Sequence, residues 1–363
     1  MIQVTKPITP NLNQIQKYLE QAHSRSWLTN NGPLVRELTE RLQDYLGVRN
    51  LILTANGTLA LQVAYKALGI EEGEAVTSPF TFVATASAMK WQGTRPRFAD
   101  IEPDTLGLSP EKAEEAITSE TRGLVPVHVY GNPCDLEGFE QVSKAHNLPI
   151  IYDASHTFAV DYKGRSVLSW GDASTLSFHA TKLFHTVEGG GIVFKDREVY
   201  DQAQKMLNFG LGSSPDNIAT PGINAKMSEV HAAYGMCVLD SIDDILERRA
   251  KILGAYSEGL NGVVKTPKWR EGATQNAAYA PILLASEKQC LDVLDALKSK
   301  GVIARRYFYP SLNMVSEFQE NEHTDCSNAV DAASRALCLP IYPDLADLDV
   351  QKIIEGVKTG CKA

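Results

Sequence analysis

The sequence lacks the features of several large protein classes. No apolar run among its 363 residues approaches the length of a membrane span, and the start, MIQVTKPITPN, has no signal-peptide core. The formal net charge of −9 argues against a nucleic-acid partner attracted by bulk electrostatics. The six cysteines form no CxxC pair, so neither a disulfide framework nor a zinc site is expected. We expect a cytoplasmic protein without nucleic-acid, membrane or metal partners.

What is present is the composition of an ordinary globular enzyme, with 44% hydrophobic and 22% charged residues. Strand-like and helix-like patterns alternate through the first half, which predicts an α/β layer with a mostly parallel sheet. The expected helices are 12–24, 35–46, 58–69, 84–91, 110–117, 136–145 and 197–207. The expected strands are 51–54, 75–79, 97–101, 123–131 and 148–156.

The pattern changes after Gly191, and the length of the chain favours two domains. A helical stretch with a boundary near Leu239 leads into a smaller α+β domain. Its expected strands are 278–284, 302–309 and 337–340, and its expected helices are 289–300, 329–335 and 348–359. We predict a large domain over 1–239 and a small domain over 240–363, with the N-terminal residues able to pack against the small domain.

The stretch from Thr175 to Phe194 places one lysine, Lys182, between an apolar run and the triple glycine 189–191. Packed walls at a strand end lower the cost of removing the lysine's proton. The glycines would let the backbone approach a planar ligand closely. Taken alone, a surface lysine after a strand is the simpler interpretation.

A small-residue turn follows the strand 51–54 and leads into a helix from about Thr58. Free N–H groups and the helix dipole at such a turn bind phosphate, although an ordinary capped turn looks the same in sequence. The turn is neither a GxGxxG nor a GxxxxGK[ST] loop, so dinucleotide and triphosphate binding lose support.

Asp153 closes another buried run, and an N-cap is its common structural role. Phe80 and Phe82 follow Pro79 at a third strand end, where either ring could cover a planar ligand or pack in the core. In parallel sheets ligands lie beyond the carboxyl ends of the strands. We therefore predict one site that combines the phosphate-binding turn, an aromatic ring, the aspartate at a strand end and the lysine. Pyridoxal phosphate needs this set of groups.

The sequence resembles the DegT/DnrJ/EryC1/StrS family of pyridoxal-phosphate-dependent nucleotide-sugar aminotransferases. The resemblance implies the aspartate-aminotransferase fold (fold type I). The matching motifs are ANGTLAL (55–61), SPFTFVAT (78–85), YDASH (152–156), SFHATKLFHTVEGG (177–190), GINAKMSEVHAA (222–233), ARRYFYPSL (304–312) and LCLPIYPDL (337–345). Within the family, ATKLFHTVEGG and INAKMSE suggest the enzymes that make a 4-amino-4,6-dideoxy sugar on dTDP.

The resemblance implies a role for each matching residue. Lys182 binds the cofactor aldehyde covalently and moves protons, and Asp153 holds the pyridine nitrogen. His156 lies near the phenolic oxygen of the ring. Gly57 and Thr58 bind phosphate through their amides, although many relatives carry serine where this turn has asparagine.

Further roles concern the rest of the cofactor and the substrates. Ser177 adds a hydroxyl to the phosphate site, and Phe82 stacks on the ring. Asn224 reaches the cofactor phosphate of the neighbouring subunit, which implies a homodimer with shared active sites. The residues assigned to the nucleotide-sugar are Arg306, Tyr309 and His185. Further candidate substrate walls are Trp27, the 210–222 loop and the 305–309 segment.

The implied reaction moves the amine of L-glutamate, through the cofactor, to a dTDP-4-keto-6-deoxy sugar for surface polysaccharide synthesis. Amination at C3 of a dTDP-sugar, or of a UDP-sugar, is the alternative within this chemistry. Outside it stand a ligand-binding regulator of the same fold and a cofactor-free lysine enzyme such as an aldolase. Lys182 and Asp153 count against the regulator, and Asp153 would have no purpose in the aldolase.

Overall fold

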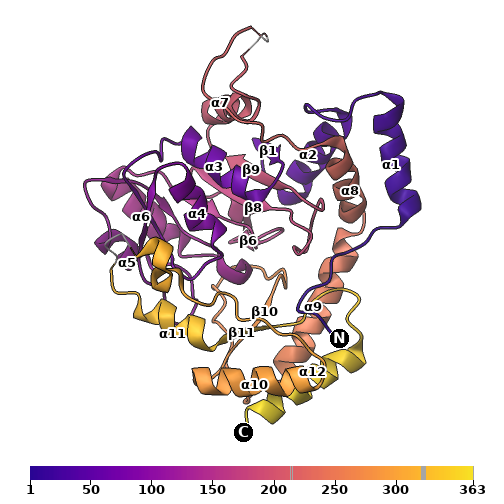
Figure 1. Cartoon of the computed structure of the whole chain (residues 1–363), viewed down its shortest axis with the longest axis vertical. Helices are drawn as coiled ribbons and strands as arrows, with labels where there is room; N and C mark the ends of the chain where they lie inside the picture. Colours follow the sequence, from indigo (N-terminus) through magenta and orange to yellow (C-terminus); the bar gives the residue numbers. More distant parts are fainter. Residues whose placement is uncertain (213, 215, 320–323, 363) are drawn as a thin grey trace.

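A central sheet flanked by helices occupies the first two thirds of the chain in the computed structural model (Figure 1). The structure describes residues 1–212, 214, 216–319 and 324–362. The strands of the sheet are β1 (Leu51–Thr54), β2 (Glu74–Thr77), β3 (Arg95–Phe98), β4 (Thr121–Val125), β5 (Ile151–Asp153), β8 (Ala173–Ser177) and β9 (Gly190–Phe194). A short hairpin, β6 (Asp161–Tyr162) and β7 (Arg165–Ser166), stands apart from it.

Most neighbours in the sheet are parallel, as the alternating pattern predicts. One group has the order β3-β2-β4 and the other β1-β9-β8-β5, and parallel bridges at Leu124–Ile150 and Val127–Asp153 link β4 to β5. Strand β9 is the exception, because it runs antiparallel to both β1 and β8. No helix connects β8 to β9, and a connection without a crossover favours antiparallel pairing.

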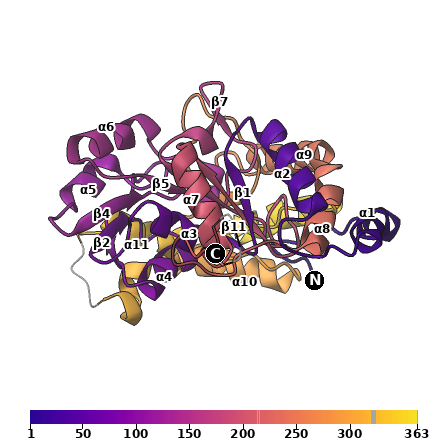
Figure 2. The same ribbon diagram turned by 90° about the horizontal axis from the view of Figure 1, so that it is seen from above.

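Helices cover both faces of the sheet (Figure 2). They are α1 (Leu12–Ser24), α2 (Pro33–Leu46), α3 (Gly57–Ala67), α4 (Ala84–Trp91), α5 (Pro110–Glu115), α6 (Leu136–His146), α7 (Arg197–Leu207) and α8 (Glu229–Leu239). Ile151 packs in the core beneath α3, whereas Ile150 and Tyr152 pack in the core beneath α5 and α6. This alternation follows from the two-residue period of a strand, and a strand buried on both faces is apolar throughout.

The C-terminal third forms a second hydrophobic core below the sheet in Figure 1. Its elements are α9 (Ile242–Gly259), β10 (Ala280–Leu283), α10 (Glu287–Ser299), α11 (Ser327–Arg335), β11 (Ala336–Leu339) and α12 (Asp347–Gly360). Strands β10 and β11 pair antiparallel. Ile2 belongs to this core and bridges to Val302. The predicted helix boundary near Leu239 is confirmed by the break between α8 and α9.

The predicted strand 302–309 is wrong. In this fully described segment Val302 bridges to Ile2 and Arg305 bridges to Cys338, but no ladder joins the two bridges. The branched and aromatic side chains that suggest a strand instead supply core residues such as Phe308. In the described part of the chain, no helix combines the length and the apolar character needed to cross a bilayer.

The start of helix α2 is capped from a distant part of the chain. The carboxylate of Glu229, which is fully buried, accepts from the amides of Leu34 at 2.8 Å and Val35 at 2.9 Å. A Cβ on Gly32 would lie only 2.5 Å from the Glu229 carboxyl carbon, so glycine is needed there. A negative group at a helix N-terminus satisfies free amides and complements the dipole.

We expect Glu229→Ala to lower the free energy of unfolding by about 2–4 kcal/mol, since two buried amides lose their acceptor. Urea denaturation followed by circular dichroism measures the change. Glu258→Ala, on the exposed side of α9, is the matched control and should change stability by less than about 0.5 kcal/mol. Equal stability of the two variants would contradict the capping role.

Candidate active site

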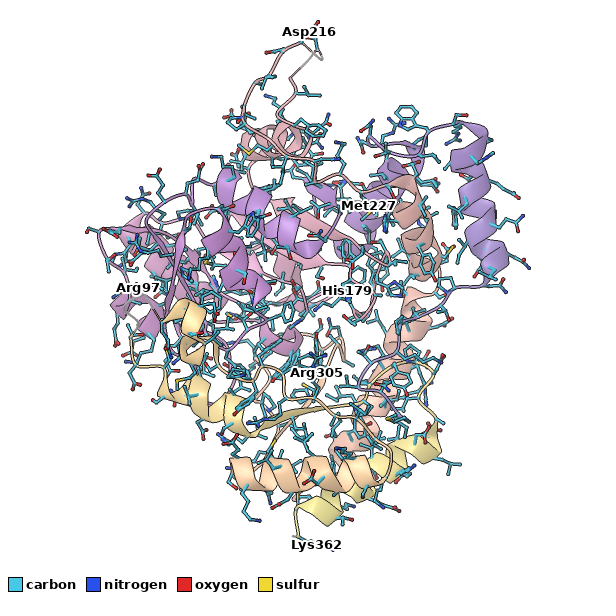
Figure 3. All side chains as sticks on the ribbon, viewed as in Figure 1. Arg97, His179, Asp216, Met227, Arg305 and Lys362 are labelled. Atoms are coloured by element: carbon cyan, nitrogen blue, oxygen red, sulfur yellow. The ribbon has the colours of Figure 1, made fainter. Side chains whose placement is uncertain are left out.

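Seven of the residues predicted from sequence line one cavity of about 320 Å³. They are Gly57, Thr58, Phe82, Asp153, His156, Ser177 and Lys182. His179 and Arg305, both labelled in Figure 3, also line it, one from the loop after β8 and one from the C-terminal third. The cavity therefore lies where the carboxyl ends of the sheet strands meet residues of the C-terminal third, as the rule for parallel sheets predicts.

Asp153 ends strand β5 with its carboxylate almost completely buried. Its Oδ2 accepts from Thr85 Oγ1 at 2.7 Å, and its Oδ1 accepts from the Ser155 amide at 3.1 Å. Hydrogen bonds of this kind stabilise the charged form of a carboxylate inside a protein. The aspartate is thus built to face a cationic group in the cavity.

Lys182 lies in the loop between β8 and β9 and is partly buried. Its Nζ donates to the hydroxyl of Tyr279 over 3.3 Å. Burial lowers the pKa of Lys182 to about 8, against an ordinary value of 10.5, while the charge of Asp153 acts in the opposite direction. Near neutral pH an appreciable fraction of this amine is therefore unprotonated and able to attack a carbonyl carbon.

His156 is held between two partners. Its Nδ1 accepts from the amide of Tyr130 at 3.1 Å, and its Nε2 lies 3.2 Å from the hydroxyl of Tyr279. Burial and the charge of Lys182 hold the pKa of His156 well below its ordinary value. The ring is consequently neutral and acts through hydrogen bonds.

The turn before helix α3 has the form expected of an anion site. Asn56 is the N-cap, and its Oδ1 accepts from the amide of Leu59 at 2.9 Å. The amides of Gly57 and Thr58 lie in the first turn, where the helix leaves N–H groups without an intrahelical acceptor. A Cβ on Gly57 would lie 3.0 Å from Ser177 Cβ, so glycine brings this turn against the serine.

The triple glycine 189–191 has a different purpose from the predicted one. A Cβ on Gly190 would lie 2.7 Å from the backbone of Asn56, and one on Gly189 would lie 2.0 Å from Thr186 Oγ1. The glycines therefore let β9 pass close to the phosphate-type turn and to its own loop. They make room for protein backbone and side chains, and not for a planar ligand.

Two residues predicted to contact substrate lie away from the cavity walls. His185 is buried, with Nε2 bonded to the Ile8 carbonyl at 2.9 Å and Nδ1 accepting from the Val187 amide, and burial lowers its pKa to about 4. Arg306 is bound to Glu287 at 2.7 Å and to two carbonyls at the end of α11. Both side chains are therefore already bonded to protein groups outside the cavity.

Tyr309 and Asn224 are also outside the cavity. Tyr309 is half exposed beneath the Arg306 guanidinium, which lies 3.4 Å from its ring centre. Asn224 accepts from Lys226 Nζ at 2.7 Å, in the connection between α7 and α8. Within a single chain, neither side chain faces Lys182.

The structure adds Thr85 and Tyr279, which sequence reasoning did not assign, and places Arg305 and Tyr307 of the candidate wall 305–309 on the cavity. Thr85 bonds the aspartate, Tyr279 bonds both Lys182 and His156, and Arg305 and Tyr307 line the cavity. Thr85 lies within the SPFTFVAT motif and Arg305 within the predicted substrate-wall segment, so each had a local signal. Tyr279 had none, because it follows Asp153 by 126 residues and reaches the site through packing against a cluster that contains Phe80 and Phe308.

Comparisons with known proteins agree with this geometry. The model of the "DegT/DnrJ/EryC1/StrS aminotransferase family" matches residues 11–358. The chain is 39% identical over 365 residues to the dTDP-4-amino-4,6-dideoxy-D-glucose transaminase of Shigella dysenteriae, covering 98% of each chain. It resembles DesI, whose crystal structure was determined in the presence of its TDP-sugar product, with a TM-score of 0.93 and 32% identity over 99% of this chain and 94% of DesI.

A third comparison concerns the cofactor. Spr1654 from Streptococcus pneumoniae in its PLP form has a TM-score of 0.90 and 26% identity, over 99% of this chain and 98% of that one. Family, fold and site thus point to the same chemistry. The chain belongs to the DegT/DnrJ/EryC1/StrS aminotransferase family, and it is a nucleotide-sugar aminotransferase that depends on pyridoxal phosphate.

Proposed function

We propose that this enzyme transfers the amino group of L-glutamate to C4 of a dTDP-4-keto-6-deoxy sugar, with dTDP-4-dehydro-6-deoxyglucose as the substrate. The product would be a dTDP-4-amino-4,6-dideoxy sugar for surface polysaccharide synthesis. The observation that carries the transamination is the placement of Lys182 and Asp153 in one cavity beside the first turn of α3. The choice of sugar is supported by the similarity to the Shigella dysenteriae transaminase.

The residues of the cavity fit pyridoxal phosphate. When bound, this cofactor supplies a carrier for the amino group and a ring that accepts electrons. The Lys182 amine, whose pKa is lowered to about 8, would hold its aldehyde, and the Asp153 carboxylate would face the ring nitrogen. The amides of Gly57 and Thr58 and the hydroxyl of Ser177 would hold its phosphate, because all three meet at the N-terminus of α3.

Two further side chains would orient the ring. Phe82 presents a half-exposed ring to the cavity and is supported by Phe308, whose ring centre lies 6.4 Å away. It would cover one face of the cofactor, as aromatic rings do through stacking. His156, neutral and fixed by its hydrogen bonds, would act at the phenolic oxygen.

We also propose the finer description of the fold and of the assembly. The fold would be of the aspartate-aminotransferase type, divided into a large domain over 1–239 and a small domain over 240–363. The connection between α7 and α8 carries exposed apolar side chains at Phe209, Ile218 and Ile223, which a second copy would cover. In such a homodimer Asn224 would reach the neighbouring active site.

We propose Arg305 as the residue that binds the anionic part of the substrates. It lines the cavity and is exposed, whereas Arg306 is bound to Glu287 and to carbonyls. Arg305→Ala should raise KM for the nucleotide-sugar roughly tenfold or more, since a charged hydrogen bond contributes about 1.5–3 kcal/mol. Arg306→Ala is the comparison and should reduce stability more than affinity. A raised KM in Arg306→Ala alone would restore the assignment made from sequence.

The test of the function is the visible absorption spectrum of the purified enzyme before and after addition of L-glutamate. The band of lysine-bound pyridoxal phosphate should give way to that of the pyridoxamine form. The keto-sugar should then restore the first band, and NMR of the product should show nitrogen on C4. Nitrogen on C3, or recovery only with a UDP-sugar, would overturn the proposed substrate. A protein that takes up no cofactor would overturn the site assignment.

A further inference from the structure

Tyr279 touches the reactive lysine, yet the function proposed above assigns it no role. Lys182 Nζ donates to its hydroxyl oxygen over 3.3 Å, and His156 Nε2 lies 3.2 Å from the same oxygen. The tyrosine ring also lies under the ammonium, with 5.8 Å from Nζ to the ring centre. One oxygen therefore joins two site residues that come from separate loops.

The partners of His156 determine the direction of this contact. The Tyr130 amide donates to Nδ1 over 3.1 Å, so Nδ1 is an acceptor and the hydrogen of the neutral ring lies on Nε2. The amide is aimed by an unusual backbone, because Tyr130 has a φ of 58°. Nε2–H consequently donates to the hydroxyl oxygen of Tyr279, which accepts from both the histidine and the lysine.

The segment that carries the tyrosine is held from two sides. Arg249 of α9 donates from Nε to the Ala277 carbonyl at 2.9 Å and from Nη2 to the Ala278 carbonyl at 2.7 Å. Asn276 donates to the carbonyl of His156 at 2.9 Å. Both side chains are only 4% exposed. Such buried, satisfied networks fix the position of a side chain, here that of the hydroxyl relative to the histidine.

We propose that Tyr279 is a further catalytic residue, which holds the free amine of Lys182 in the active site and tunes its protonation. The proposal rests on the assignment of Lys182 as the lysine that binds the cofactor. The hydroxyl oxygen accepts from the ammonium and thus offsets part of the cost of burying its charge. Whenever the amine is not bonded to a carbon atom, Tyr279 holds it in the cavity through this hydrogen bond.

Other groups that face the lysine act in the same balance. The charge of Asp153 raises the pKa of Lys182 and Tyr307 does so as well, whereas burial lowers it more. The remaining titratable or charged groups on the cavity wall are His156, His179, Glu188 and Arg305. The acceptor that Tyr279 offers to Lys182 Nζ is proposed to favour the charged amine in addition to these effects.

The test is the rate at which the cofactor-free enzyme captures pyridoxal phosphate, followed by absorbance from pH 6 to 10. The wild-type rate should rise with a midpoint near pH 8, as the amine loses its proton. In Tyr279→Phe the ammonium loses an acceptor, so the midpoint should move to lower pH by about one unit. The kcat of the loaded enzyme should fall by roughly tenfold or more with KM little changed, because the amine is no longer held for proton transfer.

Tyr18→Phe is the matched control, since it removes a tyrosine hydroxyl that bonds Asp240 at the far end of α8 at 3.0 Å and lies outside the cavity lining. Its midpoint should stay within a few tenths of the wild-type value. If Tyr279→Phe does not fold, 3-fluorotyrosine can be introduced at position 279 alone. The fluorine weakens the hydroxyl oxygen as an acceptor with almost no change of shape. The midpoint should then move in the same direction by a smaller amount. A Tyr279→Phe midpoint equal to that of Tyr18→Phe overturns the proposal. Failure of the wild type to capture cofactor overturns the function instead.

Discussion

Lys182→Ala is expected to lose between about 10²- and 10⁴-fold in kcat, because no other amine on the cavity wall can move protons at the reacting atoms. The variant should also lose its covalent link to the cofactor. Borohydride reduction of the loaded enzyme followed by mass spectrometry measures this directly. The wild type should gain the mass of the cofactor, and the variant should remain unchanged.

Lys195→Ala is the control for this experiment. Lys195 follows β9 on the exposed surface, so its loss changes the same charge without touching the cavity. It should retain wild-type activity and accept the cofactor mass. Full turnover by Lys182→Ala, or cofactor mass on that variant, would mean that another group carries the chemistry.

The second large effect is expected at Asp153. Asp153→Asn keeps the size of the side chain and can keep its contact with the Thr85 hydroxyl at 2.7 Å, but it removes a buried negative charge. Removing one partner of a buried ion pair costs about 3–5 kcal/mol, which corresponds to roughly 10²- to 10⁴-fold in rate. We therefore expect a kcat at least a hundredfold below wild type, with the cofactor band shifted because the ring nitrogen loses its proton.

Asp161→Asn, on the exposed hairpin strand β6, tests whether any loss of charge has this effect. It should leave both kcat and the absorption band unchanged. Steady-state kinetics and the spectrum of each loaded variant provide the two measurements. If Asp153→Asn keeps its activity, the aspartate serves only as a structural hydrogen-bond partner of Thr85 and Ser155.

Much of the secondary structure follows from local patterns. The predicted helices over 84–91 and 197–207 coincide with α4 and α7, and the predicted strand 51–54 coincides with β1. Apolar periodicity and capping residues such as Asp196 act over a few neighbouring positions, so sequence contains them. The strand prediction for 302–309 was wrong because a strand depends on distant residues. Its composition favours a strand, but pairing needs a partner along its whole length, and Ile2 and Cys338 each supply only one bridge.

The cofactor-binding residues of the site could also be predicted from sequence, because parallel strands end at the same edge of a sheet. Lys182, Asp153 and the Gly57 turn all follow strand ends, so local order along the chain brings them together. The sequence could not predict which of Arg305 and Arg306 faces the cavity. Neighbouring residues in an irregular segment point in different directions, and only the contacts of Arg306 with Glu287 and α11 show which side chain is already occupied.

By itself the sequence determined the alternating α/β pattern, the lysine, its aspartate and the phosphate-type turn, since each depends on short-range order. Only the tertiary structure decided that β9 runs antiparallel, that its glycines make room for the Asn56 turn, and that Tyr279 meets Lys182. The contacts of Gly190 with Asn56 and of Lys182 with Tyr279 join segments about a hundred residues or more apart. No local pattern records which distant side chain will occupy the space beside a given atom.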